Sequence, residues 1–307
     1  MLENIRSNYI LKIIIKDHLP KKEYFLLVKY NKNLQKRLDI TLEHIKKYYF
    51  SEIFYRTDIE LTPIAKLNPN KRYYFLKIFE NKDYYHIYFD DKKNETKRDY
   101  LTTADKVKKI TIKIDKEVDS LSKLFRDCEV LEEIKFIKFN RSDLCDMSEM
   151  FYGCKSLVKL DVKKVNTTNV ISMNWMFCLC ESLTVLDLNN FDTKNVIEMN
   201  NVFAGCIRLK KLYFKFNTKN VESMKCMFFR CLSLRELDIS NFDTSKVRNS
   251  SEMFYQCANL TDLILGKFEL RKDCLITGMF GECNETFIQK IKRNLPTNMD
   301  MFNKKEL

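Results

Sequence analysis

Cysteine is the residue type in this sequence with the widest chemical potential, because thiols bind metal ions, form disulfides and act as nucleophiles. Seven of the eleven cysteines stand in a Phe-x-x-Cys unit that recurs at steps of 26, 26, 26, 25, 26 and 26 residues. The pairs are Phe125/Cys128, Phe151/Cys154, Phe177/Cys180, Phe203/Cys206, Phe228/Cys231, Phe254/Cys257 and Phe280/Cys283. No Cys-x-x-Cys pair occurs, and the three histidines lie outside this series. We therefore expect no metal and no cofactor, and interpret these cysteines as small buried side chains, with disulfides or metal binding as the alternatives.

Aspartates form a second repeated set, at Asp161, Asp187 and Asp238. A row of carboxylates has the groups that acid–base catalysis uses, but such catalysis needs two groups in unlike environments. A repeated position gives like environments, so we expect these side chains to point outward and to bond to the backbone or to solvent. The sequence shows no Gly-rich phosphate loop and no Ser/His/Asp set, and we expect no enzyme.

The residues around each unit predict the elements that position these side chains. Near residues 173–196, a spacing of three and four joins Val170, Met173, Met176, Phe177 and Cys180. This spacing predicts a short helix, and the step of two between Leu186 and Leu188 predicts a strand. A threonine precedes four of the predicted helices, and we expect its hydroxyl to cap the helix: Thr167, Thr193, Thr218 and Thr244.

Stacked units of this kind predict an α/β solenoid of about seven 26-residue helix–strand repeats at residues 105–283. Because helices are about 10 Å apart and strands about 4.8 Å, the parallel sheet is expected on the concave side. Residues 284–307 are expected to form a capping helix and tail, whose apolar face includes Phe287, Ile288 and Ile291.

The run Met-x-x-Met-Phe-x-x-Cys-x-x-Leu-x-x-Leu-Asp-Leu-x-x-Phe-Asp-Thr-x-x-Val resembles the BspA-type leucine-rich repeat. The resemblance covers residues 121–283 and is fullest at 173–196 and 224–247. It implies a leucine-rich-repeat solenoid that binds proteins, and the family includes surface proteins linked to adhesion. The sequence shows no secretory signal or anchor of the kind that surface proteins carry.

Residues 1–104 are expected to form a small α+β domain, either a cap or a docking module. The order helix, Leu19-Pro20, helix within residues 1–50 is faintly similar to an F-box, and a plain helical cap or oligomerisation module is the alternative. The β-rich runs at 72–79 and 84–89 predict a hairpin.

Charge and hydropathy limit the kinds of partner and the cellular location that we expect for this chain. Fifty-four basic and 42 acidic residues give a net charge of +12, but the basic residues are spread along the chain, which disfavours nucleic acid. No segment is long and apolar enough to span a membrane. We expect a cytoplasmic location, with the cell surface as the alternative that the resemblance implies.

The leading hypothesis is a non-enzymatic protein-interaction module that uses outward-pointing strand residues. These candidate residues are Lys135, Asp161, Asp187, Lys211, Tyr213, Asp238 and Ile264. They mix both charges with apolar side chains, which suits a protein surface. The alternatives are a BspA-like surface adhesin and an F-box-like substrate adaptor of a ubiquitin ligase.

Overall fold

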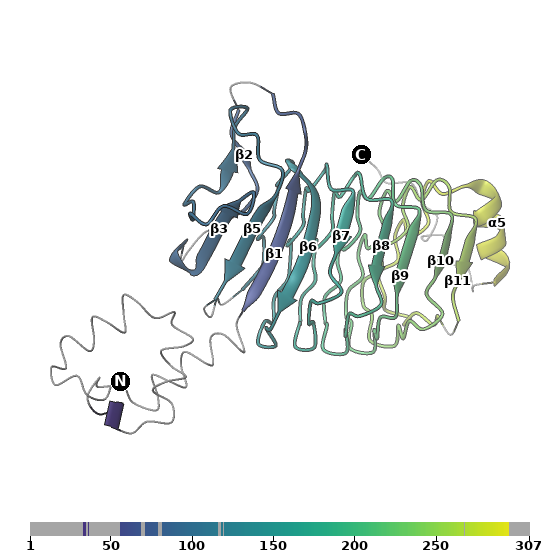
Figure 1. Ribbon diagram of the computed structural model, residues 1–307. Coiled ribbons are helices and arrows are strands. Elements are labelled where there is room, and N and C mark those ends of the chain that lie inside the picture. Colours follow the sequence, from purple (N-terminus) through teal and green to yellow (C-terminus); the bar gives the residue numbers. More distant parts are fainter. Residues whose placement is uncertain are drawn as a thin grey trace. The chain divides into compact units, whose positions relative to one another are not determined.

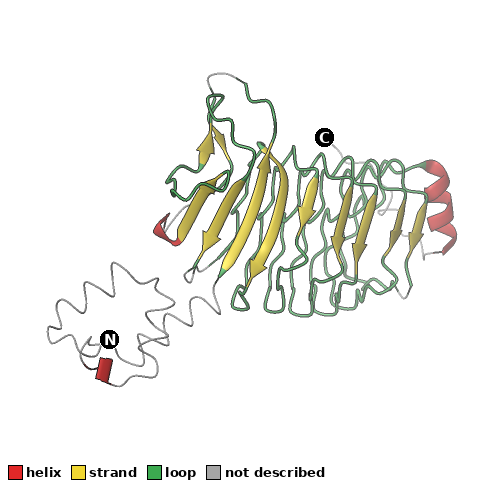
Figure 2. Cartoon of the chain, in the orientation of Figure 1, coloured by secondary structure: helices red, strands yellow, loops and turns green. Residues whose placement is uncertain are grey.

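The computed structural model describes residues 33–34, 36, 56–68, 71–78, 82–115, 118, 120–266 and 268–294. The chain divides into two units, one comprising Met1–Arg56 with Asp115–Glu117, the other Thr57–Ile114 with Val118–Leu307. Nearly all described residues belong to the second unit, whose elements are drawn in Figures 1 and 2. The F-box-like segment at residues 1–50 lies outside the described residues, apart from Asn33, Leu34 and Lys36.

A five-stranded sheet forms the start of the second unit. Its order is β3-β5-β1-β6-β7, with bounds Tyr85–Phe89 (β3), Ile110–Ile114 (β5), Thr57–Pro63 (β1), Leu131–Phe139 (β6) and Lys159–Asp161 (β7). The strands β3, β5, β1 and β6 pair antiparallel, and β6 and β7 pair parallel. Strict burial of alternate residues in β1, β3 and β5 explains why these segments are strands, since one face covers the core.

The hairpin that the sequence predicted between residues 72–79 and 84–89 is wrong. Strand β2 (Tyr73–Tyr74) pairs instead with β4 (Tyr100–Leu101), and β3 pairs with β5. A 3-10 helix at Lys82–Tyr84 precedes β3. Both runs have strand character, but strand character alone does not select the partner strand.

From β6 onward the chain winds into parallel coils of 25 or 26 residues. Each coil contributes one strand to a row that continues with β8 (Val185–Leu188), β9 (Lys211–Phe214), β10 (Glu236–Asp238) and β11 (Asp262–Ile264) (Figure 1). Strands β8 and β9 pair parallel, as do β10 and β11. A second ladder of parallel bridges joins other positions of successive coils: Asp146, Ser172, Glu198, Ser223, Asn249 and Leu275.

The predicted helix in each repeat is absent from the described coils, so the expected alternating helix–strand solenoid is wrong. The backbone N–H of Phe151 donates to the Met176 carbonyl of the next coil at 2.9 Å, and that of Phe177 to the Val202 carbonyl at 2.9 Å. In a helix these N–H groups would bond four residues back. Trp175 and Leu179 also have φ of +61° and +58°, which a right-handed helix excludes. The segment is therefore a series of turns (Figure 2).

Without a helix in each coil, the sheet has no reason to be concave. The predicted curvature relied on wide helices standing opposite narrow strands. In the structure the turn segment of each coil is hydrogen-bonded to that of the next coil, and the strands are hydrogen-bonded in the pairs β6–β7, β8–β9 and β10–β11. No wide helical side therefore stands opposite the strands.

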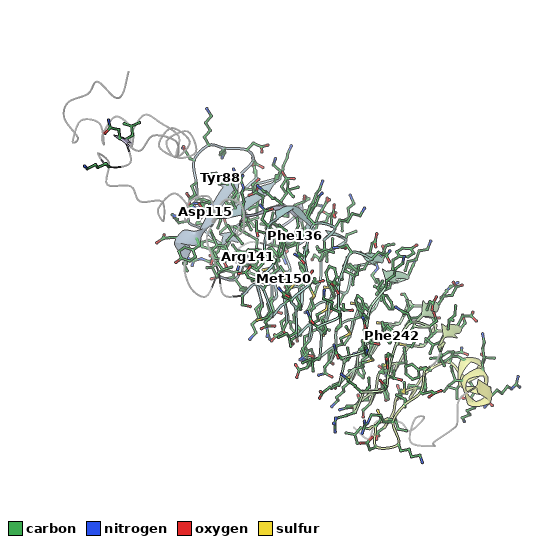
Figure 3. The ribbon with its side chains drawn as sticks, turned by 90° about the horizontal axis from the view of Figure 1, so that it is seen from below. Tyr88, Asp115, Phe136, Arg141, Met150 and Phe242 are labelled. Atoms are coloured by element: carbon green, nitrogen blue, oxygen red, sulfur yellow. The ribbon has the colours of Figure 1, made fainter. Side chains whose placement is uncertain are left out.

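The core contains the repeated phenylalanines, as the sequence predicted. Rings of successive coils stack with centroids 5.3 to 5.8 Å apart, in the order Phe125, Phe151, Phe177, Phe203, Phe228, Phe254 and Phe280. Phe136, Met150 and Phe242, labelled in Figure 3, are buried in the same unit. The helix α5 (Glu285–Asn294) covers the last coil as predicted, with Phe287 packed edge-on against Phe280 at 6.0 Å.

The Phe-x-x-Cys cysteines are buried or nearly so, and their thiols have a specific role. The Cys180 thiol donates to the Phe151 carbonyl of the preceding coil at 3.2 Å, and the Cys206 thiol donates to the Phe177 carbonyl at 3.1 Å. All eleven cysteines are free. Burial raises the pKa of these thiols, in Cys283 to about 12, so they are packing groups rather than nucleophiles.

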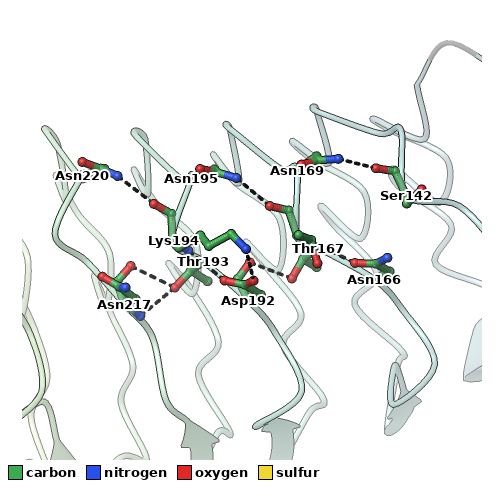
Figure 4. Close-up of polar contacts among 11 residues, drawn as sticks. Ser142, Asn166, Thr167, Asn169, Asp192, Thr193, Lys194, Asn195, Asn217 and Asn220 are labelled. Atoms are coloured by element: carbon green, nitrogen blue, oxygen red, sulfur yellow. Dashed lines mark hydrogen bonds and ion pairs between the residues drawn. The ribbon is translucent and has the colours of Figure 1, made fainter.

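The repeated threonines join coils instead of capping helices, which corrects the predicted role. Thr167 and Thr193 are buried, and their hydroxyls donate to the Asp192 carbonyl at 2.9 Å and to the Asn217 carbonyl at 3.0 Å of the next coil. Asparagine side chains make the reverse connection, such as Asn195 to the Thr168 carbonyl at 2.7 Å (Figure 4). These bonds give backbone carbonyls of one coil a hydrogen-bond donor from the neighbouring coil.

Candidate functional site

The strand face is the surface formed by the outward-pointing residues of β6 to β11. Of the seven predicted residues, Asp161 and Asp187 are half-buried there. The other five are exposed: Lys135, Lys211, Tyr213, Asp238 and Ile264. Parallel pairing brings neighbours together, with Lys135 beside Asp161, Asp187 beside Tyr213 and Asp238 beside Ile264. The strands fall into separate sheets, β6 with β7, β8 with β9 and β10 with β11, so the structure assembles these residues in pairs.

The three aspartates of this face are engaged with their own turns. The Asp161 carboxylate accepts the N–H of Lys163 at 3.2 Å. Asp187 accepts the N–H of Asn189 at 3.1 Å, and Asp238 accepts that of Ser240 at 2.9 Å. Hydrogen bonds from Ser240 lower the pKa of Asp238. The predicted bonding of these carboxylates to the backbone is therefore confirmed.

Large apolar side chains are exposed on the same face. Val185, Tyr213 and Ile264 are 47%, 46% and 56% exposed. Val185 lies directly beside Lys211 on the neighbouring strand. Charged pairs flank them, including Glu133 and Lys159 at 3.9 Å. The strand face thus combines apolar contact area with charges of both signs.

A hollow of about 690 Å³ lies on the turn side of the coils, where the sequence predicted nothing. We call it the turn-side groove. Aromatic walls and a floor of small residues define it: Tyr152, Trp175, Cys178, Ala204, Gly205 and Phe229. In the sequence, the groove is indicated by the position that follows each repeated phenylalanine. This position is aromatic in three of the coils that line or adjoin the groove, at Tyr152, Phe229 and Tyr255. It is small in two consecutive coils, at Cys178 and Ala204.

Four cysteines lie outside the Phe-x-x-Cys series, and of these Cys145 is exposed. Cys178, Cys226 and Cys274 are buried. Desolvation raises the pKa of Cys178 to about 12, so this thiol is protonated at neutral pH and unreactive. Cys178 therefore serves the groove as a small apolar floor residue.

Metal and membrane features can be assessed over the part of the chain that the structure describes. Within those residues, no cluster of three or more His, Cys, Asp or Glu side chains is arranged to hold a metal ion. Among the helices described, none has the length and apolar character needed to cross a membrane.

Comparisons with known proteins correct the resemblance drawn from the repeat. No curated protein and no solved structure matches the sequence. One protein family does match, at residues 119–209 and 179–294, which together span more than half of the 307 residues. This family is not the BspA-type leucine-rich-repeat family, so the resemblance is wrong on family as well as on the helical repeat. The chain belongs to the family described as Mycoplasma protein of unknown function, DUF285.

Proposed function

We propose that this chain is a non-enzymatic binding protein that contacts a protein partner through the strand face. The observation that carries the proposal is the exposure of Val185, Tyr213 and Ile264 on paired strands. Exposed apolar side chains grouped on one surface and surrounded by charges are typical of protein interfaces. Tyrosine is also among the residues that contribute most to binding energy at such interfaces.

Charge distribution favours a protein over a polyanion. Along the strand face a base stands beside an acid, as with Lys135 and Asp161, or beside an apolar residue, as with Lys211 and Val185. Two acids, Glu236 and Asp262, lie side by side on the last strands. A nucleic-acid surface would present lysine and arginine throughout, since phosphate neutralisation supplies most of the affinity.

The role of the aspartates supports binding rather than catalysis. Each of Asp161, Asp187 and Asp238 accepts the N–H two residues ahead, so each carboxylate is held by the turn that follows its own strand. An acid–base pair requires environments that move two pKa values apart. The adhesin alternative depended on the BspA resemblance and loses its support with it. The ligase-adaptor hypothesis concerns residues 1–50 and stays a prediction.

Photo-cross-linking in the native cells tests the proposal. A benzoylphenylalanine replaces Tyr213 in the full chain, and a matched control carries it at Ile171, which is 46% exposed but lies beside the bridge ladder. We expect a discrete protein adduct from position 213 that is lost when Lys211→Glu and Val185→Ser are added. Identical products from positions 213 and 171, or no adduct from 213, would overturn the proposal.

A further inference from the structure

The turn-side groove is an interruption in a column of stacked side chains. The column consists of the residues that follow the repeated phenylalanines: Arg126, Tyr152, Cys178, Ala204, Phe229 and Tyr255. At one end the Arg126 guanidinium lies over the Tyr152 ring, 4.6 Å from its centroid. At the other end Phe229 and Tyr255 stack with centroids 5.4 Å apart. Between these ends Cys178 and Ala204 supply no ring, so two coils of the column are vacant.

We propose that the turn-side groove binds an aromatic side chain presented by a peptide or loop of a protein partner, which occupies the part of this vacancy above Ala204, next to Phe229. The inference rests on the proposed protein-binding function but assigns a second surface, on a different side of the coils. The buried phenylalanine column shows that rings 5.3 to 5.8 Å apart match the coil repeat. A ring inserted above Ala204 can therefore stack on Phe229 in the same way.

The walls and floor suit a flat apolar group. Trp175 is 40% exposed and lines the groove, and its ring lies 6.1 Å from that of Tyr152. The floor is closed, because Cys178 and Ala204 are buried. A hollow of about 690 Å³ falls within the roughly 300–1,000 Å³ of pockets that hold small-molecule ligands. Aromatic pairs in such positions add stabilisation beyond the area that they bury.

The rim suits the backbone of an uncharged peptide. It carries two acids and two bases, Glu181, Glu252, Lys225 and Arg230, so it has no net charge to select a polyanion or a polycation. Among the described residues, the side chains of Glu181, Lys225 and Arg230 make no hydrogen bond or ion pair. They are available as donors and acceptors for the amides that flank an inserted ring.

Trp175 is the single tryptophan of the chain, so its fluorescence reports on the groove directly. The full chain is titrated with the capped peptide acetyl-Gly-Gly-Phe-Gly-Gly-amide, with the same peptide carrying Ala in place of Phe, and with cellobiose. We expect a saturable change with the Phe peptide, with a dissociation constant of the order of 1 mM for a lone anchor. Binding of the Ala peptide should be at least about tenfold weaker.

Two variants connect this signal to the vacancy. Ala204→Phe places a ring beside Phe229. The equivalent position of the next coil is Phe229 itself, so a coil can hold phenylalanine there. We expect the variant to weaken peptide binding at least about tenfold. Ala258→Phe is the matched control, because Ala258 is exposed and does not line the groove, and binding should be unchanged. Phe229→Ala removes the opposite wall and should also weaken binding, which gives an independent reading if Ala204→Phe lowers the melting temperature.

Three results would overturn the inference: no saturable change with the Phe peptide, equal binding of the Phe and Ala peptides, or a response to cellobiose alone. The cross-link from position 213 separates this failure from failure of the proposed function. If Ala204→Phe abolishes peptide binding and the cross-link persists, two surfaces act independently, as we infer. If the peptide fails and the cross-link persists, only the groove assignment is wrong.

Discussion

Truncation of Phe203 tests the stacked core most directly. Phe203 is fully buried, and its ring stacks on Phe177 at 5.7 Å and 3° and on Phe228 at 5.5 Å and 15°. A Phe→Ala change in a core costs about 3–5 kcal/mol through lost transfer energy and the cavity left behind. Each stacked aromatic pair adds about 0.5–1.5 kcal/mol beyond area. With a partner on both faces, we expect Phe203→Ala to lower the free energy of unfolding by about 4–5 kcal/mol.

Equilibrium urea denaturation of the full chain, followed by circular dichroism, measures this loss. Phe203→Leu is the matched control, because it retains most of the buried volume without the ring, and we expect a loss of about 1.5 kcal/mol. Asp187→Ala controls for the surface and should change the free energy of unfolding by less than about 1 kcal/mol. Since each coil contacts only its neighbours, Phe203→Ala should also broaden the transition by uncoupling the two halves.

A loss below about 1 kcal/mol for Phe203→Ala would refute the reasoning, because no fully buried ring between two others can be removed at that cost. Equal losses for the Ala and Leu variants would show that volume is irrelevant at this position, which would refute the cavity argument. An unchanged transition width would contradict the one-dimensional coupling of the coils but not the stacking itself.

Three further predictions concern charge, thiols and backbone. Hydrogen bonds from Arg98 hold the pKa of Asp105 at about 2, below its ordinary 3.8. The stability that this carboxylate contributes is therefore present above pH 3.8 and is lost as the pH falls through about 2. Asp105→Asn should flatten the acid side of the curve of stability against pH, measured by thermal melting. Cys145 is exposed and should be the thiol that reacts rapidly with Ellman's reagent in the native protein, and loss of the fast phase in Cys145→Ser would verify the assignment. A side chain at Gly266 would meet the backbone of Ser240, so Gly266→Ala should lower the free energy of unfolding by about 1–3 kcal/mol in urea denaturation. At Gly205 the nearest atom is the flexible tip of the Leu179 side chain. A larger loss of stability from Gly205→Ala than from Gly266→Ala would contradict the argument.

Much of the candidate site could be predicted from side-chain order. Alternation within the strands placed Lys211, Tyr213 and Ile264 outward, and the structure exposes all three. The turn-side groove could not be predicted in the same way, because its floor and walls belong to four coils and come together only when the coils are stacked in register. The sequence does show small residues, Cys178 and Ala204, at a position that is aromatic in neighbouring coils. That these small residues leave a hollow depends on how the coils stack.

The sequence by itself determined the length of the coil, the burial of the Phe-x-x-Cys series and the amphipathic helix that covers the last coil. These features follow from which side chains are apolar and how far apart they stand, and burial responds to that pattern alone. Only the tertiary structure decided that the segment around Phe177 is a turn rather than a helix. A spacing of three and four residues shows only that one side of the segment is buried. It does not show which backbone groups pair, and the N–H of Phe177 donates to the carbonyl of Val202, 25 residues ahead. That choice depends on the neighbouring coil, which satisfies the same backbone groups that a helix would otherwise pair within itself.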